Sequence, residues 1–273
     1  MAITNSSDSK REFGGELRGF SRNLVCLYFF GALLHAAAAD PAPRVTSVTP
    51  LPQRLYADSK ARWRKETNSV EAAWQFGRAA FGMAELATND TRRELLANEG
   101  IDACRRAIAI DPDSAAAHYY LGLNYGQLAQ TKLLGALKLV EQMEEEWKIT
   151  LKLDAKFDYA GPYRTLGVLY RDAPGWPTSI GSRAKARDHL KKAQELHPDY
   201  PGNRLTLYEA CAKWGEKKIV QDQVAATEDF LKAARTKWAG EEWALDWQDW
   251  NKRWELIKAK CSVVPARSPR EGR

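Results

Sequence analysis

The sequence has few of the side chains from which metal and nucleophilic sites are built. It contains four histidines and four cysteines among 273 residues. No two cysteines have the C-x-x-C spacing, and the H-E-x-x-H, Walker, G-x-S-x-G and Rossmann patterns are absent. An acidic run at 141–146 has no positioned acid–base partner and is interpreted as a solvated helix face. The sequence therefore predicts a protein that is not an enzyme and holds neither a metal nor a cofactor.

A strong excess of charge of either sign is also missing. The formal net charge is +6, from 41 basic and 35 acidic residues that are interspersed along the chain. A nucleic-acid-binding surface normally needs basic residues clustered on one face. The composition predicts a solvated surface and no nucleic-acid partner.

The chain has no long hydrophobic run beyond one short segment near its start. Arg18 and Arg22 precede the apolar run from Leu24 to Leu34, and small residues follow at 36–39. This order is typical of a secretory signal cleaved after an A-x-A site. We expect a signal peptide over residues 1–39 and a periplasmic or otherwise exported protein. The alternative is an uncleaved anchor, which would be its one membrane contact.

The remaining chain divides by composition into three parts. Residues 40–55 contain four prolines and predict an extended linker, 56–261 predict a helical domain, and 262–273 predict a disordered tail. Three cysteines, Cys104, Cys211 and Cys261, would remain after cleavage, and their pairing stays open. Apolar residues at three- and four-residue spacing predict helices over these runs: Glu71–Leu86, Arg92–Ile110, Ala115–Ala129, Leu133–Leu153, Tyr163–Tyr170, Ser182–Leu196 and Asn203–Lys213.

An internal repeat runs through the helical part. Helix ends of similar sequence place Pro112, Ala155 and Pro198 in one frame, 43 residues apart. The segment Leu-Gly-x-x-Tyr follows at 121–125 and again at 166–170, with a weaker version at 207–211. Recurrence at a fixed period is the signature of stacked helical hairpins.

These segments resemble the tetratricopeptide repeat over roughly residues 70–215. In that family Leu-Gly-x-x-Tyr lies on the first helix of a hairpin, and small residues followed by Pro mark the second. The positions of Ala186, Leu190, Ala193 and Pro198 match the second helix. The resemblance implies an all-α fold, an α-solenoid of hairpins in which Gly122 and Gly167 lie at close helix contacts. The 43-residue period exceeds the family's 34, so some loops or helices are longer.

One of these longer loops resembles a segment of the T-component proteins of TRAP transporters, which are periplasmic helical-repeat proteins. The similarity rests on Pro-Gly-Trp-Pro at 174–177, Ser-Ile-Gly at 179–181 and Pro-Asp-Tyr-Pro at 198–201. It implies an exported protein that binds a partner in a solute-uptake system. Trp176 stands between Gly175 and Pro177, where no helix can continue. We expect Trp176 either to contribute to a binding surface or to pack back onto the helices.

The predicted function is a scaffold for an extracytoplasmic protein or peptide. The expected lining of its inner surface consists of polar first-helix residues: Asn124, Gln127, Arg164, Arg171 and Arg204. His118 lies at a bulky repeat position and is expected to pack and not to bind a ligand. The alternative function is a small-molecule or lipid carrier with an apolar channel between the helices.

The C-terminal helix carries an unusual stripe of tryptophans. Trp243, Trp247, Trp250, Trp254 and Ile257 are separated by four, three, four and three residues, which places them on one helix face. We expect this Trp-rich helix to cap the end of the solenoid. The alternative is that part of the stripe reaches a partner, because Trp is enriched in binding hot spots.

Overall fold

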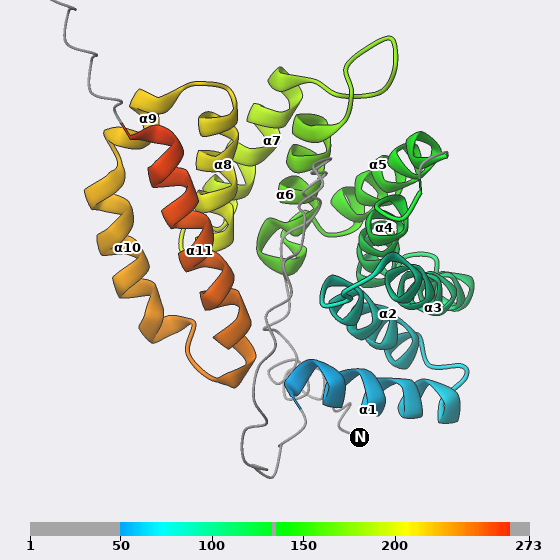
Figure 1. Ribbon diagram of the computed structural model, residues 1–273. Coiled ribbons are helices and arrows are strands. Elements are labelled where there is room, and N and C mark those ends of the chain that lie inside the picture. The colour runs from blue at the N-terminus through cyan, green and yellow to red at the C-terminus, as the bar shows by residue number, and fades with distance from the viewer. Residues whose placement is uncertain (1–49, 133–134, 263–273) are drawn as a thin grey trace, which may run out of the picture. The chain divides into compact units, whose positions relative to one another are not determined.

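The computed structural model describes residues 50–132 and 135–262, and within them every regular element is a helix (Figure 1). The expectation of an all-α fold is confirmed for this part of the chain. None of the helices in these ranges is long and apolar enough to span a membrane. The predicted signal peptide and nearly all of the predicted tail lie outside the described residues.

The chain divides into two compact units, and the division falls between Leu196 and His197. We call residues 50–196 the N-terminal unit and residues 197–262 the C-terminal unit. The N-terminal unit contains seven helices: α1 (Leu51–Lys65), α2 (Val70–Glu85), α3 (Asp90–Ile110), α4 (Ala115–Ala129), α5 (Ala136–Leu153), α6 (Phe157–Asp172) and α7 (Arg183–Leu196). The C-terminal unit contains four more and a 3-10 turn: α8 (Pro201–Lys213), α9 (Lys217–Gln221), α10 (Val224–Lys237), η1 (Glu241–Trp243) and α11 (Ala244–Cys261).

Local sequence signals explain where several helices begin. Ser69, Asn89 and Ser114 stand just before α2, α3 and α4, and each accepts a hydrogen bond from a backbone N–H of the first turn. Short polar side chains are favoured there because they satisfy a free helix N–H. Pro201 occupies the first turn of α8, where a missing N–H costs nothing.

The predicted linker is wrong at its C-terminal end. Helix α1 begins at Leu51, with Pro50 as its cap and Pro52 buried in its first turn. These prolines start a helix and do not extend a linker, because the fixed φ of proline suits the first helical turn. Residues 40–49 of the predicted linker lie outside the described residues.

Three helix pairs of the N-terminal unit are built around a glycine. A Cβ added to Gly77 would lie 2.2 Å from Cys104 Sγ, one added to Gly122 would lie 2.4 Å from Trp147 Nε1, and one added to Gly167 would lie 2.6 Å from Leu190 Cδ2. The prediction of close helix contacts at Gly122 and Gly167 is confirmed. The three opposing side chains, at positions 104, 147 and 190, keep the 43-residue spacing read from the sequence.

Successive helices of the N-terminal unit pack against one another. Each of α1 to α6 contacts the next helix, and α2 also contacts α4, which in turn contacts α6. The first helices of the three pairs therefore lie next to each other, as in stacked hairpins. Figure 1 shows this order from α1, in blue, to α7, in yellow-green.

The tryptophan stripe is the core of the C-terminal unit. Trp243 belongs to the 3-10 turn and the other three tryptophans to α11, and the exposed fractions of all four are 8% or less. Trp250 contacts Tyr200, Trp243 and Trp247, with ring centroids 4.9–6.0 Å apart. Helices α9 and α10 were not among the runs predicted from sequence. Helix α10 contacts α11 through Arg235, whose guanidinium lies 4.3 Å from the centre of the Trp247 ring.

Candidate functional site

Two of the predicted surface residues of α4 are interior residues. Asn124 has no exposed surface, and its Nδ2 donates to the carbonyl oxygens of Gly77, at 3.0 Å, and Tyr120, at 2.7 Å. Gln127 is 3% exposed. The expectation that these two side chains line an open surface is therefore wrong. Asn124 fills the space above Gly100, where a Cβ would lie 2.2 Å from its Oδ1, and so connects α4 to α2 and α3.

His118 is also interior, as expected for a packing residue. Its Nδ1 lies 2.5 Å from Glu146 Oε2 on α5, and its Nε2 lies 2.9 Å from the carbonyl oxygen of Pro112. Both partners are acceptors, so both ring nitrogens donate only when the imidazole is protonated. Burial lowers the pKa of His118, but the hydrogen bonds to Glu146 and Pro112 outweigh it and the pKa is raised. His118 thus links α4 to α5 through a charge-assisted hydrogen bond to Glu146.

Arg164 belongs to a buried polar cluster with Tyr119 and Asp158. Its Nη2 lies 2.9 Å from Asp158 Oδ2, and that oxygen also accepts a hydrogen bond from the Tyr119 hydroxyl at 2.8 Å. The side chains of Arg164 and Asp158 are only 9% and 8% exposed. Burial raises the pKa of Tyr119, and the Asp158 carboxylate raises it further, so the phenol stays a hydrogen-bond donor. Arg164 therefore joins α4 to the start of α6.

The start of α6 has a backbone that the sequence did not predict. Asp158, Tyr159 and Ala160 have φ values of 50°, 57° and 62°, in the left-handed region. This conformation costs roughly 1–2 kcal/mol for each residue other than glycine. Arg164 donates to the carbonyl oxygens of Asp158 and Tyr159, both at 3.2 Å, and so binds the turn from inside. The one signal in the sequence is the Gly-Pro pair at 161–162, which often marks a turn.

Arg171 and Arg204 are held by neighbours within their own units. Arg171 makes a two-pronged ion pair with Asp172, at 2.9 and 2.7 Å, and both side chains are 7% exposed. Arg204 belongs to the C-terminal unit and places its guanidinium carbon 3.9 Å from the centre of the Phe230 ring. Within the N-terminal unit, Asn124, Gln127, Arg164 and Arg171 are therefore buried or paired and do not line an open surface.

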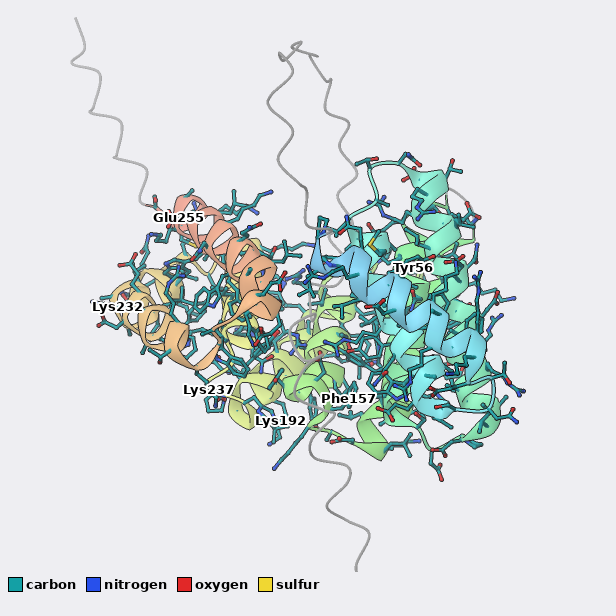
Figure 2. All side chains as sticks on the ribbon, turned by 90° about the horizontal axis from the view of Figure 1, so that it is seen from below. Tyr56, Phe157, Lys192, Lys232, Lys237 and Glu255 are labelled. Atoms are coloured by element: carbon teal, nitrogen blue, oxygen red, sulfur yellow. The ribbon has the colours of Figure 1, made fainter. Side chains whose placement is uncertain are left out.

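An aromatic row that the sequence analysis missed does follow the first helices. The rings of Trp74 and Tyr120 are stacked, 5.9 Å apart and 5° from parallel. The Arg78 guanidinium lies 5.9 Å from the Tyr120 ring, and Phe157 meets that ring edge-on at 6.2 Å. Trp74, Arg78 and Phe157 are half-buried, and Figure 2 shows Phe157 at the start of α6. The repeat did offer a signal for this row, because Trp74 lies three residues before Gly77 on α2, as Tyr119 lies three residues before Gly122 on α4.

Trp176 is the most exposed large apolar side chain of the described residues, at 89%. The alternative that it packs back onto the helices is therefore wrong. The loop that carries it is closed by backbone hydrogen bonds, from Gly181 N–H to the Pro174 carbonyl oxygen and from Ser182 N–H to the Tyr170 carbonyl oxygen, both at 2.8 Å. A Cβ at Gly181 would lie 2.1 Å from the Ala173 carbonyl oxygen, so glycine is needed there for the loop to close. The backbone holds Trp176 in the solvent.

The described residues contain no group of three or more His, Cys, Asp or Glu side chains that could hold a metal ion. Cys104, Cys211 and Cys261 are all buried, and no disulfide joins them to one another. Burial raises the pKa of the Cys104 thiol, and Glu146 raises it further. A thiol of that kind is a poor nucleophile.

A comparison with known protein families finds a match within the N-terminal unit. Residues 53–156 match the model of a family described as regulator of microtubule dynamics protein 1-3. The chain is also similar to regulator of microtubule dynamics protein 1 of Bos taurus, with 22% identity over 185 residues. That match covers 61% of this chain and 57% of the relative, so the chain spans little more than half of the relative's length. The family match runs from α1 to just past α5 and includes the first two glycine-centred pairs.

Proposed function

We propose that this chain is a helical-repeat scaffold of the tetratricopeptide type that binds a protein or peptide partner and performs no chemistry of its own. The observation that carries the proposal is Trp176, which is 89% exposed on a loop closed by its own backbone. A large, rigid aromatic side chain loses little entropy on binding and is the commonest kind of hot spot. The loop is also an insertion relative to a standard repeat, and inserted loops of repeat proteins often form binding surfaces.

The repeat architecture supports the same function. The three glycine-centred pairs and the contacts from α2 to α4 and from α4 to α6 agree with a solenoid of hairpins. The burial of the tryptophans of α11 supports our proposal that this helix caps the array. The half-buried Trp74, Arg78 and Phe157 would give the first helices an aromatic contact surface.

The place of action is part of the proposal. The pattern of residues 1–39 supports export, and the resemblance of the Trp176 loop to T-component proteins suggests a partner in solute uptake. The printed name of the bovine relative suggests a second candidate, an effect on microtubule dynamics, and the match over residues 53–156 favours it. Mass spectrometry of the native protein separates the two, because an intact Met1 would contradict cleavage of the signal. Sedimentation of the full chain with assembled microtubules tests the second candidate directly.

The scaffold proposal is tested by photo-crosslinking in the native cell. A benzoylphenylalanine at position 176 should capture a partner. The same residue at position 95 is the control, because Leu95 is 51% exposed on α3 and the proposal gives it no role. A discrete adduct from position 176 alone supports the scaffold function. Equal adducts from both positions, or none from either, would contradict it.

A further inference from the structure

The helix that follows the Trp176 loop is basic. Helix α7 has five basic residues, at 183, 185, 187, 191 and 192, against two acidic residues, Asp188 and Glu195. Within the loop itself, residues 173–182 carry no charged side chain. The exposed Trp176 therefore precedes α7, a helix with three more basic than acidic residues.

Three lysines of α7 reach the solvent. Ala186, Leu190 and Ala193 are buried in the helix pair, whereas Lys185, Lys191 and Lys192 are exposed. Figure 2 shows Lys192 pointing outward from α7. Its Nζ lies 3.2 Å from Glu195, but the two side chains are 48% and 64% exposed. A surface pair of this kind contributes little and is readily exchanged for another carboxylate.

Lys185 is positioned by the root of the loop. Its Nζ lies 5.1 Å from the centre of the Tyr170 ring, and the Tyr170 carbonyl oxygen accepts the hydrogen bond from Ser182 N–H that closes the loop. Lys185 and the base of the loop that carries Trp176 are therefore both in contact with Tyr170. Lys192 follows Lys185 by two helical turns and so lies on the same face of α7, whereas Lys191 is turned by about 100° from Lys192. We call Trp176, Lys185 and Lys192 the Trp–Lys surface.

We propose that the Trp–Lys surface binds an acidic segment of a partner protein. An apolar side chain of that segment packs on the Trp176 indole, and its carboxylates pair with Lys185 and Lys192. The inference rests on the proposed scaffold function and adds the chemistry of the partner to it. Charge complementarity also sets the kinetics, because a basic surface attracts an acidic segment before contact is made.

The charge pattern favours a protein segment over an anionic membrane. Asp188 and Glu195 are exposed among the lysines of the same helix. A lipid surface is negative everywhere and would meet these carboxylates, whereas a peptide can place its acids beside the lysines only. Membrane binding also needs substantial inserted apolar area. Trp176 is the one large apolar side chain exposed on this loop, because Ile180 is partly buried.

The test uses the full chain and four probes. Two are fluorescent peptides of equal length, one of alternating glutamate and leucine and one with glutamine in place of glutamate. The other two are phosphatidylcholine vesicles with and without phosphatidylserine. Anisotropy reports peptide binding and sedimentation reports vesicle binding, each at low and high salt. We expect the acidic peptide to bind, the glutamine peptide to bind much more weakly, and salt to reduce the difference.

Two variants and a matched control test the residues. Lys185→Glu with Lys192→Glu should weaken acidic-peptide binding by about tenfold or more, and Trp176→Ala should weaken it by about thirtyfold. The control is Lys65→Glu with Lys138→Glu, which makes the same change in net charge at exposed lysines of α1 and α5. It should leave binding within about twofold, since long-range charge effects are screened. All variants should keep the wild-type melting temperature.

The outcomes separate this inference from the scaffold function. Equal loss in both lysine pairs would show a net-charge effect and overturn the Trp–Lys surface. Binding to phosphatidylserine vesicles but not to the peptide would overturn the acidic segment in favour of a membrane. If no acidic probe binds while position 176 still crosslinks a partner, the acidic inference fails and the scaffold function stands. If neither binding nor crosslinking occurs, both fail.

Discussion

In the N-terminal unit each helix pair closes over a glycine, whereas in the C-terminal unit the same place in the repeat pattern is taken by an aromatic ring. Gly122 and Gly167 follow the leucine of the repeat, and side chains of the second helix press against their bare backbone. In the weaker copy at 207–211 the residue after the leucine is Tyr208, whose ring contacts Trp254 at 6.4 Å. In the N-terminal unit the helices of a pair approach closely because glycine has no side chain. In the C-terminal unit large aromatic side chains fill the space between the helices.

The difference has an energetic consequence. A glycine contact tolerates no added volume, since a neighbour is already closer than a Cβ would allow. An aromatic core tolerates no removed volume, because deleting a large side chain leaves a cavity. The two units should therefore respond in opposite ways to large and small substitutions.

The largest effect is expected for Trp250→Ala in the C-terminal unit. Trp250 is 1% exposed and contacts three aromatic rings. Its removal should lower the free energy of unfolding by about 3–5 kcal/mol. Because the chain has two compact units, unfolding should be followed with a probe in each one and not assumed to be two-state. A loss below about 1 kcal/mol would show that the aromatic cluster is not a packed core.

The converse substitution, Gly167→Leu, is expected to act in the N-terminal unit. The new side chain would collide with Leu190, whose Cδ2 lies 2.6 Å and whose backbone nitrogen lies 3.2 Å from the position of a Cβ. We expect a cost of roughly 1–3 kcal/mol. Chemical denaturation of Gly167→Leu, Leu190→Ala and the double variant forms a cycle. Overpacking requires the glycine substitution to cost less when Leu190 is already alanine, and a constant cost would contradict the contact.

The glycine contacts were predictable because the repeat carries them. A sequence pattern that recurs at a fixed period reflects packing that all copies share. The close helix contacts of Gly122 and Gly167 could therefore be predicted from the sequence alone. Features that occur in one copy only were missed. The left-handed turn at 158–160 depends on the buried Arg164–Asp158 pair, and no periodic signal describes it.

The predicted site residues show a similar limit. Polar character and a place on a first helix favour an open surface for Asn124 and Gln127, but burial depends on which neighbours are small. Gly100 leaves the space that Asn124 enters, and the partner of a glycine is not visible until the helices are paired. The sequence left the fate of Trp176 open for a related reason. Flanking glycine and proline exclude a helix but do not say which way the loop closes.

A pH series should resolve the polar contact inside the second helix pair. The pKa of His118 is raised in the folded state because its hydrogen bonds to Glu146 and Pro112 outweigh its burial. The protonated form is therefore favoured by folding, and its contribution is complete below the unfolded pKa of about 6.5. That contribution is lost as the pH rises through the folded pKa. We expect the free energy of unfolding to fall over that window.

The control for this series is His118→Gln, which removes the titrating group. His189 has the opposite sign, because burial lowers its pKa despite its hydrogen bond to the Lys185 carbonyl oxygen. The difference between wild type and His118→Gln cancels His189 and isolates His118. A difference that stays constant with pH would show that folding does not shift the pKa of His118, and one that grows with pH would show that folding lowers it.

The smallest effect on stability is expected for Trp176→Ala, although the residue lost is the same as in Trp250→Ala. At 89% exposed, Trp176 buries almost no area, and backbone hydrogen bonds hold its loop. The unfolding free energy should change by less than about 0.5 kcal/mol, as for ordinary surface substitutions. Partner binding should weaken by about 2 kcal/mol if Trp176 is a hot spot. Melting curves for both variants, with pull-down of the crosslinked partner, compare the two tryptophans directly. If Trp176→Ala destabilised the fold as much as Trp250→Ala, the loop would be part of a core, and its indole could not be the binding anchor.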